Sequence, residues 1–114
     1  MAYDSVLTAL ADPTRRELYV SLRRGDRTVS ELASLTRISQ PATSQHLRVL
    51  REAELVTETR DGTRRYYRAS TVGLEQLRGF IESLWDDVLA AYAADDPAPP
   101  RRAARKKTKN RRTS

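Results

Sequence analysis

The order of local patterns between residues 28 and 68 constrains this chain more than any other feature of its sequence. Thr28 and Glu31 have the spacing of a capping box, in which each side chain bonds the backbone N–H of the other residue at the start of a helix. Apolar residues follow at helical spacing, so a short helix is predicted here. Its buried face is predicted to consist of Val29, Leu32 and Leu35.

A second short helix and a hairpin follow. Ser39 is a favoured N-cap residue, and Pro41 fits the first turn of a helix, where its missing N–H costs nothing. Two strand-like stretches, 56–60 and 64–68, are then joined by Asp61 and Gly62, a frequent pair in hairpin turns. Helix, turn, helix and basic hairpin in this order indicate a winged helix-turn-helix, which places one helix in the major groove of DNA.

Two helices are predicted before this region. The first carries a single apolar stripe. The second begins at Asp12 and Pro13, a capping residue followed by a proline at the first helical position, and it runs to Gly25, a natural C-terminal stop.

The stretch from about residue 72 to residue 94 is predicted to be the longest helix. Its apolar stripe is wider than one side of a small domain can cover, so we interpret the surplus, together with the first helix, as a dimer interface. A core within a single chain is the alternative. The residues predicted at this interface are Tyr3, Val6, Leu7, Leu10, Leu77, Ile81, Leu84, Trp85 and Val88.

The expected fold class is therefore mainly α with a small β-hairpin (α+β). The elements should follow the order ααααββα, as a winged helix-turn-helix that dimerises through its first and last helices.

The net charge of +6 is concentrated at one end of the chain. Residues 95–114 contain eight Lys or Arg and two Asp, whereas basic and acidic residues balance over residues 1–94. No large apolar residue occurs after residue 94, so nothing there repays the entropy lost on ordering. We expect a DNA-binding and dimerisation domain over residues 1–94 and a disordered basic tail over residues 95–114.

Several classes of protein are excluded by composition. The chain has no cysteine, which excludes disulfides and thiolate metal sites. No apolar run approaches the roughly 20 residues that span a bilayer, and the N-terminus lacks the basic start of a secretion signal, so no membrane partner is expected. No enzyme activity is expected either, because neither a nucleophile–base pair nor a Gly-rich phosphate loop is present.

Over roughly residues 5–92 the chain resembles the ArsR/SmtB family of bacterial winged-helix repressors. The resemblance rests on ALADPTRRELYVSL, TVSELA, ISQPATSQHLRVLREAELV and RDGTRRYYR, in this order and spacing. The chain is most similar to members with a DPTRR opening and a tryptophan in the last helix. The resemblance implies a homodimer with the first and last helices at the interface. We expect the protein in the bacterial cytoplasm, associated with the nucleoid when it is bound to DNA.

The chain departs from the metal-sensing branch of that family. Those sensors have Cys-x-Cys in the third helix, where this chain has Ala33 and Leu35. Other sensors use Asp and His pairs in the last helix, which here offers carboxylates but no histidine. No metal and no cofactor are therefore expected.

Glu54 is a second departure, because the family usually has glycine at this position. Glycine there ends the recognition helix in a left-handed conformation, which a β-carbon disfavours by about 1 kcal/mol. We therefore expect Glu54 to carry backbone strain.

The exposed face of the helix capped by Ser39 is predicted to contact DNA. With Leu47 and Leu50 buried, polar side chains face outward, and the N-terminal half of a recognition helix meets the base edges. Glutamine can pair bidentately with adenine. An ordinary solvated face is the alternative. The candidates are Ser39, which is chiefly a cap, and Gln40, Thr43, Ser44, Gln45 and Arg48.

The hairpin and the tail supply the candidate phosphate contacts. The wing candidates are Arg60, Thr63, Arg64 and Arg65. Next to them, one of Tyr66 and Tyr67 should pack inward, and Arg51 should form an ion pair with Glu54 or Glu58. The tail candidates are Arg101, Arg102, Arg105, Lys106, Lys107, Lys109, Arg111 and Arg112.

The predicted function is sequence-specific binding of double-stranded DNA at a palindromic operator by a homodimeric repressor that occludes a promoter, including its own. A nonspecific architectural DNA-binding protein driven by the tail is one alternative, and a protein-docking winged helix is another. A small apolar effector near Tyr3, Trp85 and Tyr92 is left open, as is the lack of any effector. The single histidine, His46, is expected to pack or to contact phosphate rather than to bind a ligand.

Overall fold

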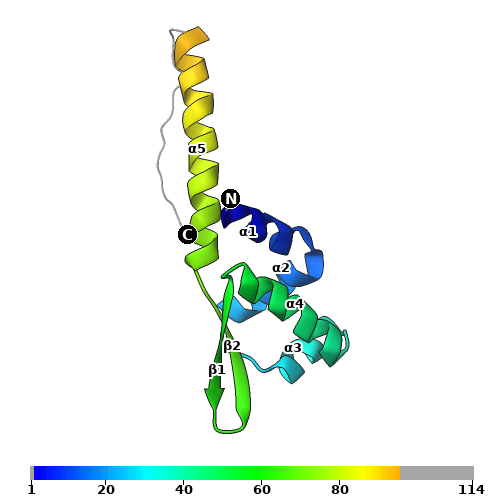
Figure 1. Cartoon of the computed structure of the whole chain (residues 1–114). Coiled ribbons are helices and arrows are strands. Elements are labelled where there is room, and N and C mark those ends of the chain that lie inside the picture. Colours follow the sequence, from blue (N-terminus) through cyan, green and yellow to red (C-terminus); the bar gives the residue numbers. More distant parts are fainter. Residues whose placement is uncertain (1, 96–114) are drawn as a thin grey trace. The chain divides into compact units, whose positions relative to one another are not determined.

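The computed structural model describes residues 2–95, and its elements follow the predicted order (Figure 1). They are α1 (Ala2–Ala11), α2 (Pro13–Arg23), α3 (Val29–Thr36), α4 (Gln40–Glu52), β1 (Val56–Asp61), β2 (Arg64–Ala69) and α5 (Val72–Asp95). The chain divides into two compact units, one ending at Phe80 and the other beginning at Ile81. All of the predicted tail contacts lie outside the described residues.

The first unit is built around one apolar core. Its helices α2, α3 and α4 pack on one another, α1 packs on α2 and α4, and the hairpin contacts α2, α3 and α4 (Figure 1). The largest fully buried apolar side chains are Val6, Leu18, Leu32, Leu47, Leu50, Leu55 and Val56. Burying a side chain of this size contributes about 1.5–3 kcal/mol, so this cluster holds the helix-turn-helix together.

Local capping fixes where three of the helices begin. Asp12 accepts hydrogen bonds from the backbone N–H groups of Thr14 and Arg15 at the start of α2. Thr28 and Glu31 form the predicted capping box at α3, and Ser39 accepts from the Ala42 N–H at α4. Each cap satisfies N–H groups that the first turn of a helix leaves without partners.

The hairpin is antiparallel, and its register corrects the predicted turn. Asp61 pairs with Arg64, so the loop consists of Gly62 and Thr63 rather than Asp61 and Gly62. Gly62 has a φ of +67°, and a positive φ at the first loop position is what a type II′ turn requires of glycine. Each strand extends one residue further than predicted.

Two predictions about burial are resolved by the strands and by α3. Tyr67 packs inward as expected, and its backbone exchanges two hydrogen bonds with Arg27, which joins the segment before α3 to β2. Leu35 was predicted to be buried, but 43% of it is exposed. The inward face of α3 continues instead through Leu32 and Ala33, which leaves Leu35 one position off that stripe.

Candidate nucleic-acid interface

Helix α4 presents one apolar and one polar face. Its buried residues are Thr43, Leu47 and Leu50. Gln40, Ser44, Gln45 and Arg48 are all exposed, as is Ser39 at the cap. The polar face therefore lies where the sequence predicted it, at the N-terminal half of the helix, which is the part that meets base edges in helix-turn-helix proteins.

Thr43 must be removed from the predicted DNA contacts. Its side chain is fully buried, and its hydroxyl donates a 2.8 Å hydrogen bond to the carbonyl oxygen of Ser39. A hydroxyl one turn into a helix is well placed for this bond to the i−4 carbonyl, which satisfies it within the core. Thr43 thus helps to close the first turn of α4 and has no surface to offer DNA.

A surface groove of about 560 Å³ brings the recognition helix and the wing together. Gln40 and Ser44 of α4 line it with Arg64 and Arg65 of β2. The start of α3 completes it through Thr28, Val29, Ser30 and Glu31. Gln45, Arg48, Arg60 and Thr63 are exposed but do not line this groove. Hydrogen-bonding side chains thus lie beside two guanidinium groups on one surface.

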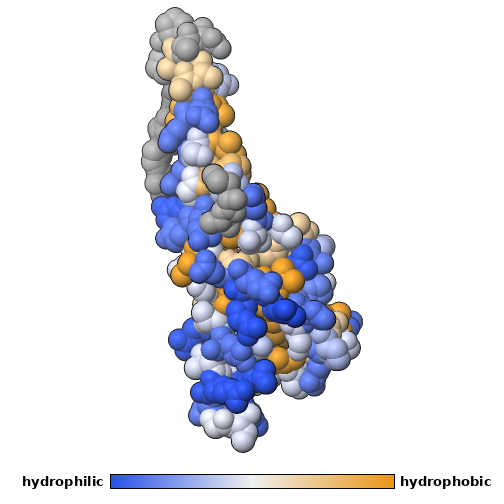
Figure 2. Space-filling view, in the orientation of Figure 1, coloured by the Kyte–Doolittle hydropathy of each residue, from blue (hydrophilic) through white to orange (hydrophobic). Residues whose placement is uncertain are grey.

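The arginines near this groove differ in whether a carboxylate holds them. Arg48 pairs with Glu52 at 3.4 Å, and both side chains are exposed, so this pair contributes little to stability. Within residues 2–95, Arg60 and Arg64 have no ion-pair partner. Figure 2 shows hydrophilic residues gathered over the hairpin. Unpaired guanidinium groups on such a surface suit phosphate oxygens.

Glu58 pairs with two arginines. One of its carboxylate oxygens lies 2.9 Å from Nη1 of Arg51, and the other lies 3.4 Å from Nε of Arg65. This decides between the two partners predicted for Arg51, since the Glu54 carboxylate instead accepts a hydrogen bond from Gln76.

Near the end of β2, Arg68 donates to both carboxylate oxygens of Asp26 at 2.9–3.2 Å. The hydrogen bond from Arg68 holds the pKa of the Asp26 carboxyl below its ordinary value and raises the pKa of Arg68. Arg68 is therefore paired with an acid of the same chain, and the pair joins β2 to the segment between α2 and α3.

Two arginines in the first turn of α2, Arg15 and Arg16, bond to backbone carbonyl groups of the same chain. Nε and Nη2 of Arg15 donate to the carbonyl oxygens of Ala9 and Thr8, and Nη1 of Arg16 donates to those of Leu10 and Ala11. They satisfy the carbonyl groups that the end of α1 leaves without partners. Only the sharp corner between α1 and α2, which the sequence signals through Asp12 and Pro13, brings them there.

His46 is partly buried on α4 and contacts the same corner. Its Nδ1 lies 3.4 Å from Nη1 of Arg15.

Among the described residues no cluster of three or more His, Cys, Asp or Glu side chains could hold a metal ion. Nor does any helix within residues 2–95 combine the length and apolar character needed to cross a membrane.

The predicted interface residues of the first unit are unequally exposed. Leu7 is exposed, Leu10 and Leu77 are partly buried against the core, and the ring of Tyr3 stacks on Phe80 with centroids 4.1 Å apart. Val6 is fully buried in the core, so it has no surface for a partner, and its place in the predicted interface is wrong.

The second unit consists, in the described chain, of the remainder of α5. Ile81, Leu84, Trp85 and Val88 are all exposed and surround a shallow hollow of about 250 Å³. Hydrophobic residues run along one side of this helix (Figure 2). Leu89 and Tyr92 widen the exposed stripe. Continuous exposed apolar surface of this kind marks an interaction site.

Comparison with known proteins agrees with this architecture. Residues 12–58 match the model of the family described as "Bacterial regulatory protein, arsR family". The chain is 43% identical over 90 residues to the HTH-type transcriptional regulator Rv2034 of Mycobacterium tuberculosis, covering 79% of this chain and 84% of that protein. It is 38% identical over 72 residues to the transcriptional repressor SdpR of Bacillus subtilis, covering 63% and 80%.

A solved structure resembles it in fold. This is the homodimeric winged helix-turn-helix DNA-binding domain of Mb0332 from Mycobacterium bovis, with a TM-score of 0.61 and 30% identity over 77% of this chain and 82% of that chain. The element order, the polar face of α4 and the sequence matches lead to one assignment. This chain belongs to the arsR family of bacterial regulatory proteins.

Proposed function

We propose that this protein is a transcriptional repressor that binds double-stranded DNA as a homodimer. The groove in which Gln40 and Ser44 lie beside Arg64 and Arg65 is the observation that carries the proposal. Amide and hydroxyl groups there can read base edges, and the two guanidinium groups can hold the adjacent phosphates. The relatives named above, a transcriptional repressor and a homodimeric DNA-binding domain, support the same function.

The exposed stripe of α5 in the second unit supports a two-fold partner. Ile81, Leu84, Trp85 and Val88 would be covered by the same stripe of a second copy. A two-fold dimer presents two recognition helices, which suits a palindromic operator with half-sites about one helical turn apart. Binding at a promoter would then exclude RNA polymerase from the same DNA.

Fluorescence anisotropy can test this proposal with DNA from upstream of the gene and with scrambled DNA of the same composition. Both the full chain and residues 1–94 are titrated at roughly 150 mM salt. We expect residues 1–94 to prefer the upstream DNA by about a hundredfold, equivalent to about 2.7 kcal/mol. Binding that lacks preference and disappears with residues 95–114 would instead identify a nonspecific architectural protein.

A further inference from the structure

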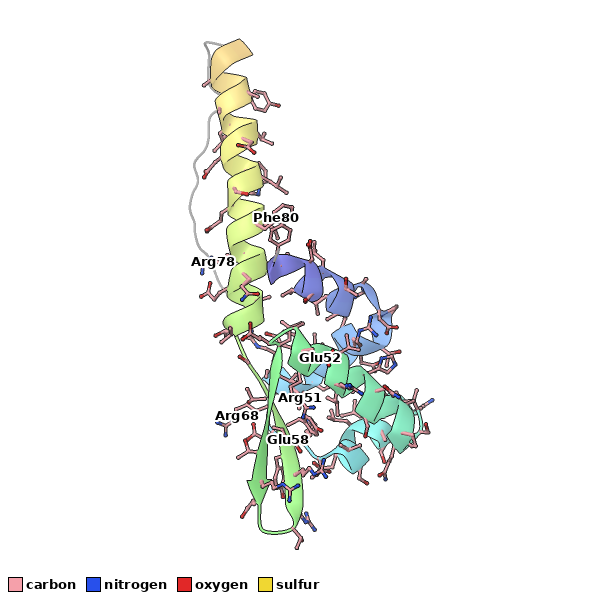
Figure 3. The ribbon with its side chains drawn as sticks, in the orientation of Figure 1. Arg51, Glu52, Glu58, Arg68, Arg78 and Phe80 are labelled. Carbon is pink, nitrogen blue, oxygen red and sulfur yellow. The ribbon has the colours of Figure 1, made fainter. Side chains whose placement is uncertain are left out.

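Glu58 joins the recognition helix to the wing through one carboxylate. Its Oε1 lies 2.9 Å from Nη1 of Arg51, which is in the last turn of α4, and its Oε2 lies 3.4 Å from Nε of Arg65, on β2. Figure 3 shows Arg51 and Glu58 close together between α4 and β1. The Glu58 side chain is only 20% exposed, against 47% for Arg51 and 57% for Arg65. A shielded acid thus holds two more exposed cations from two other elements.

The register of the hairpin places Glu58 and Arg65 on the same face of the two strands. Glu58 is opposite Tyr67, which is buried, and Arg60 is opposite Arg65 further along the same face. Side chains directly opposite one another in an antiparallel pair have Cβ atoms about 4.5–5.5 Å apart, and like charges there are destabilising. Glu58 is the diagonal neighbour that partly neutralises this pair. Arg60 and Arg65 together carry more positive charge than the Glu58 carboxylate neutralises, and a DNA phosphate could neutralise the rest.

The contact also leaves the binding end of Arg65 available. Glu58 engages Nε of Arg65, so both terminal nitrogens of that guanidinium can still donate to another acceptor. The 3.4 Å ion pair restrains the guanidinium of Arg65, and a restrained side chain loses less conformational freedom when it meets a phosphate. We propose that Glu58 is a positioning residue that fixes Arg65 for phosphate contact and fixes the wing relative to the recognition helix. This inference rests on the proposed DNA binding.

Neutralising Glu58 has opposite expected effects on DNA binding, depending on whether its charge or its contact with Arg65 matters more. A carboxylate near the DNA-facing surface repels phosphates, so its neutralisation should tighten binding and increase the dependence on salt. If Glu58 positions Arg65, its neutralisation should weaken binding although the surface becomes more positive. The sign of one measured change therefore separates the two accounts.

The test compares Glu58→Gln with Asp61→Asn in the full chain. Asp61 lies on the same strand, is exposed and has no ion pair within residues 2–95. It is opposite Arg64 in the hairpin register, so its neutralisation removes the same charge from beside a wing arginine without breaking an ion pair. Arg65→Ala and the double variant Glu58→Gln/Arg65→Ala complete a cycle, and Glu58→Asp tests whether the charge alone restores function. Affinities are measured by anisotropy across a salt series on upstream and scrambled DNA, with a thermal melt to confirm folding.

We expect Glu58→Gln to weaken binding at least fivefold. The negative slope of log K against log salt should become shallower by about 0.9, which corresponds to the loss of one phosphate contact. Asp61→Asn should bind as tightly as the wild type or more tightly, and Glu58→Asp should recover most of the loss. The double variant should bind no more weakly than Arg65→Ala. Unchanged or tighter binding by Glu58→Gln, or effects that multiply in the double variant, would overturn the inference.

Failure of the proposed function gives a different result. A wild-type protein that binds upstream and scrambled DNA equally would refute sequence-specific repression. The cycle on scrambled DNA would still report the phosphate contact of Arg65 and its dependence on Glu58. A folded wild type that binds neither DNA would refute both proposals.

Discussion

The backbone N–H of Gly73 donates a 2.8 Å hydrogen bond to the carbonyl oxygen of Glu54. This bond joins the first turn of α5 to the turn that ends α4. Glu54 itself has a φ of +60°, and its carboxylate accepts a 3.3 Å hydrogen bond from Nε2 of Gln76. A Cβ atom added to Gly73 would collide with the carbonyl oxygen of Ala53. The recognition helix and α5 therefore meet at backbone contact distance.

Gly73→Ala should destabilise the protein. Because the added methyl group meets backbone rather than a flexible side chain, the two helices must separate, which should cost about 1–3 kcal/mol. Gly79→Ala is the matched control. An added Cβ there meets nothing within 4 Å, and alanine in a helix interior is more stable than glycine by about 0.5–1 kcal/mol. Urea unfolding should show opposite signs for the two variants, and equal effects would contradict the contact.

Glu54→Gly should raise the melting temperature without weakening DNA binding. The positive φ of Glu54 confirms the predicted left-handed turn, which glycine adopts at about 1 kcal/mol less cost. That gain corresponds to roughly 4–8 °C in a domain of this size. Glu54→Ala is the necessary comparison, because it removes the contact with Gln76 and keeps the strain. The melting temperature of Glu54→Gly should exceed that of Glu54→Ala by the same roughly 4–8 °C. Similar melting temperatures for the two variants would show that the backbone at residue 54 is not strained.

Predictions from the sequence were confirmed where a structural feature depends only on residues close to one another in the sequence. The caps at Asp12, Thr28 and Ser39 need only a side chain and N–H groups two or three residues away, so spacing alone identifies them. The left-handed turn at Glu54 is equally local. The hairpin was also found, although its turn was displaced by one residue, because pairs such as Asp-Gly do not fix the register.

Predictions failed or stayed open where tertiary contacts decide. Arg15 and Arg16 lie next to a helix start and resemble surface cations, and only the fold brings them to the carbonyl groups ending α1. The pairing of Glu58 with both Arg51 and Arg65 depends on where the hairpin lies against α4. Val6 was predicted at the dimer interface and is fully buried in the core of its own chain. Thr43 was predicted among the DNA contacts, although it lies four residues before Leu47 and therefore on the same face of the helix, and it is fully buried as well.

The Asp12 cap should make the free energy of unfolding depend on pH in the acidic range. The hydrogen bond from the Arg15 N–H, with smaller contributions from the Thr14 N–H and the Arg15 charge, holds the pKa of the Asp12 carboxyl below its ordinary value of 3.8. A carboxyl whose pKa is lowered by folding contributes stability above its unfolded pKa. That stability is lost as the pH falls from about 3.8 through the lower folded value.

Asp12→Asn isolates this effect. Asparagine caps a helix equally well but does not titrate, so the variant should lose less stability than the wild type as the pH falls through 3.8. Urea unfolding of both proteins at a series of pH values measures the difference, because all other carboxyls are common to the two. Parallel stability curves for the two proteins would contradict the role of Asp12.

Leu84→Glu should convert the protein to a monomer. Leu84 lies within the exposed apolar stripe of the second unit, and a carboxylate buried there against a second copy would have no compensating charge. Ala90→Glu introduces the same group on an exposed position away from that stripe. Sedimentation equilibrium should show a dimer for the wild type and Ala90→Glu and a monomer for Leu84→Glu. Dimers in all three would place the interface elsewhere.

Gln45→Ala and Arg60→Ala should weaken DNA binding in different ways. Gln45 is exposed on the polar face of α4, so its loss should cost about 1–3 kcal/mol on one operator sequence and relax the preference at one base pair. Arg60 lies on the wing without an ion-pair partner in the described chain, so its loss should weaken binding to every sequence. The Arg60 variant alone should also reduce the salt slope, by about 0.9. Anisotropy on an operator and its single-base variants separates these outcomes. A uniform loss for Gln45→Ala would assign base recognition to other residues of the helix.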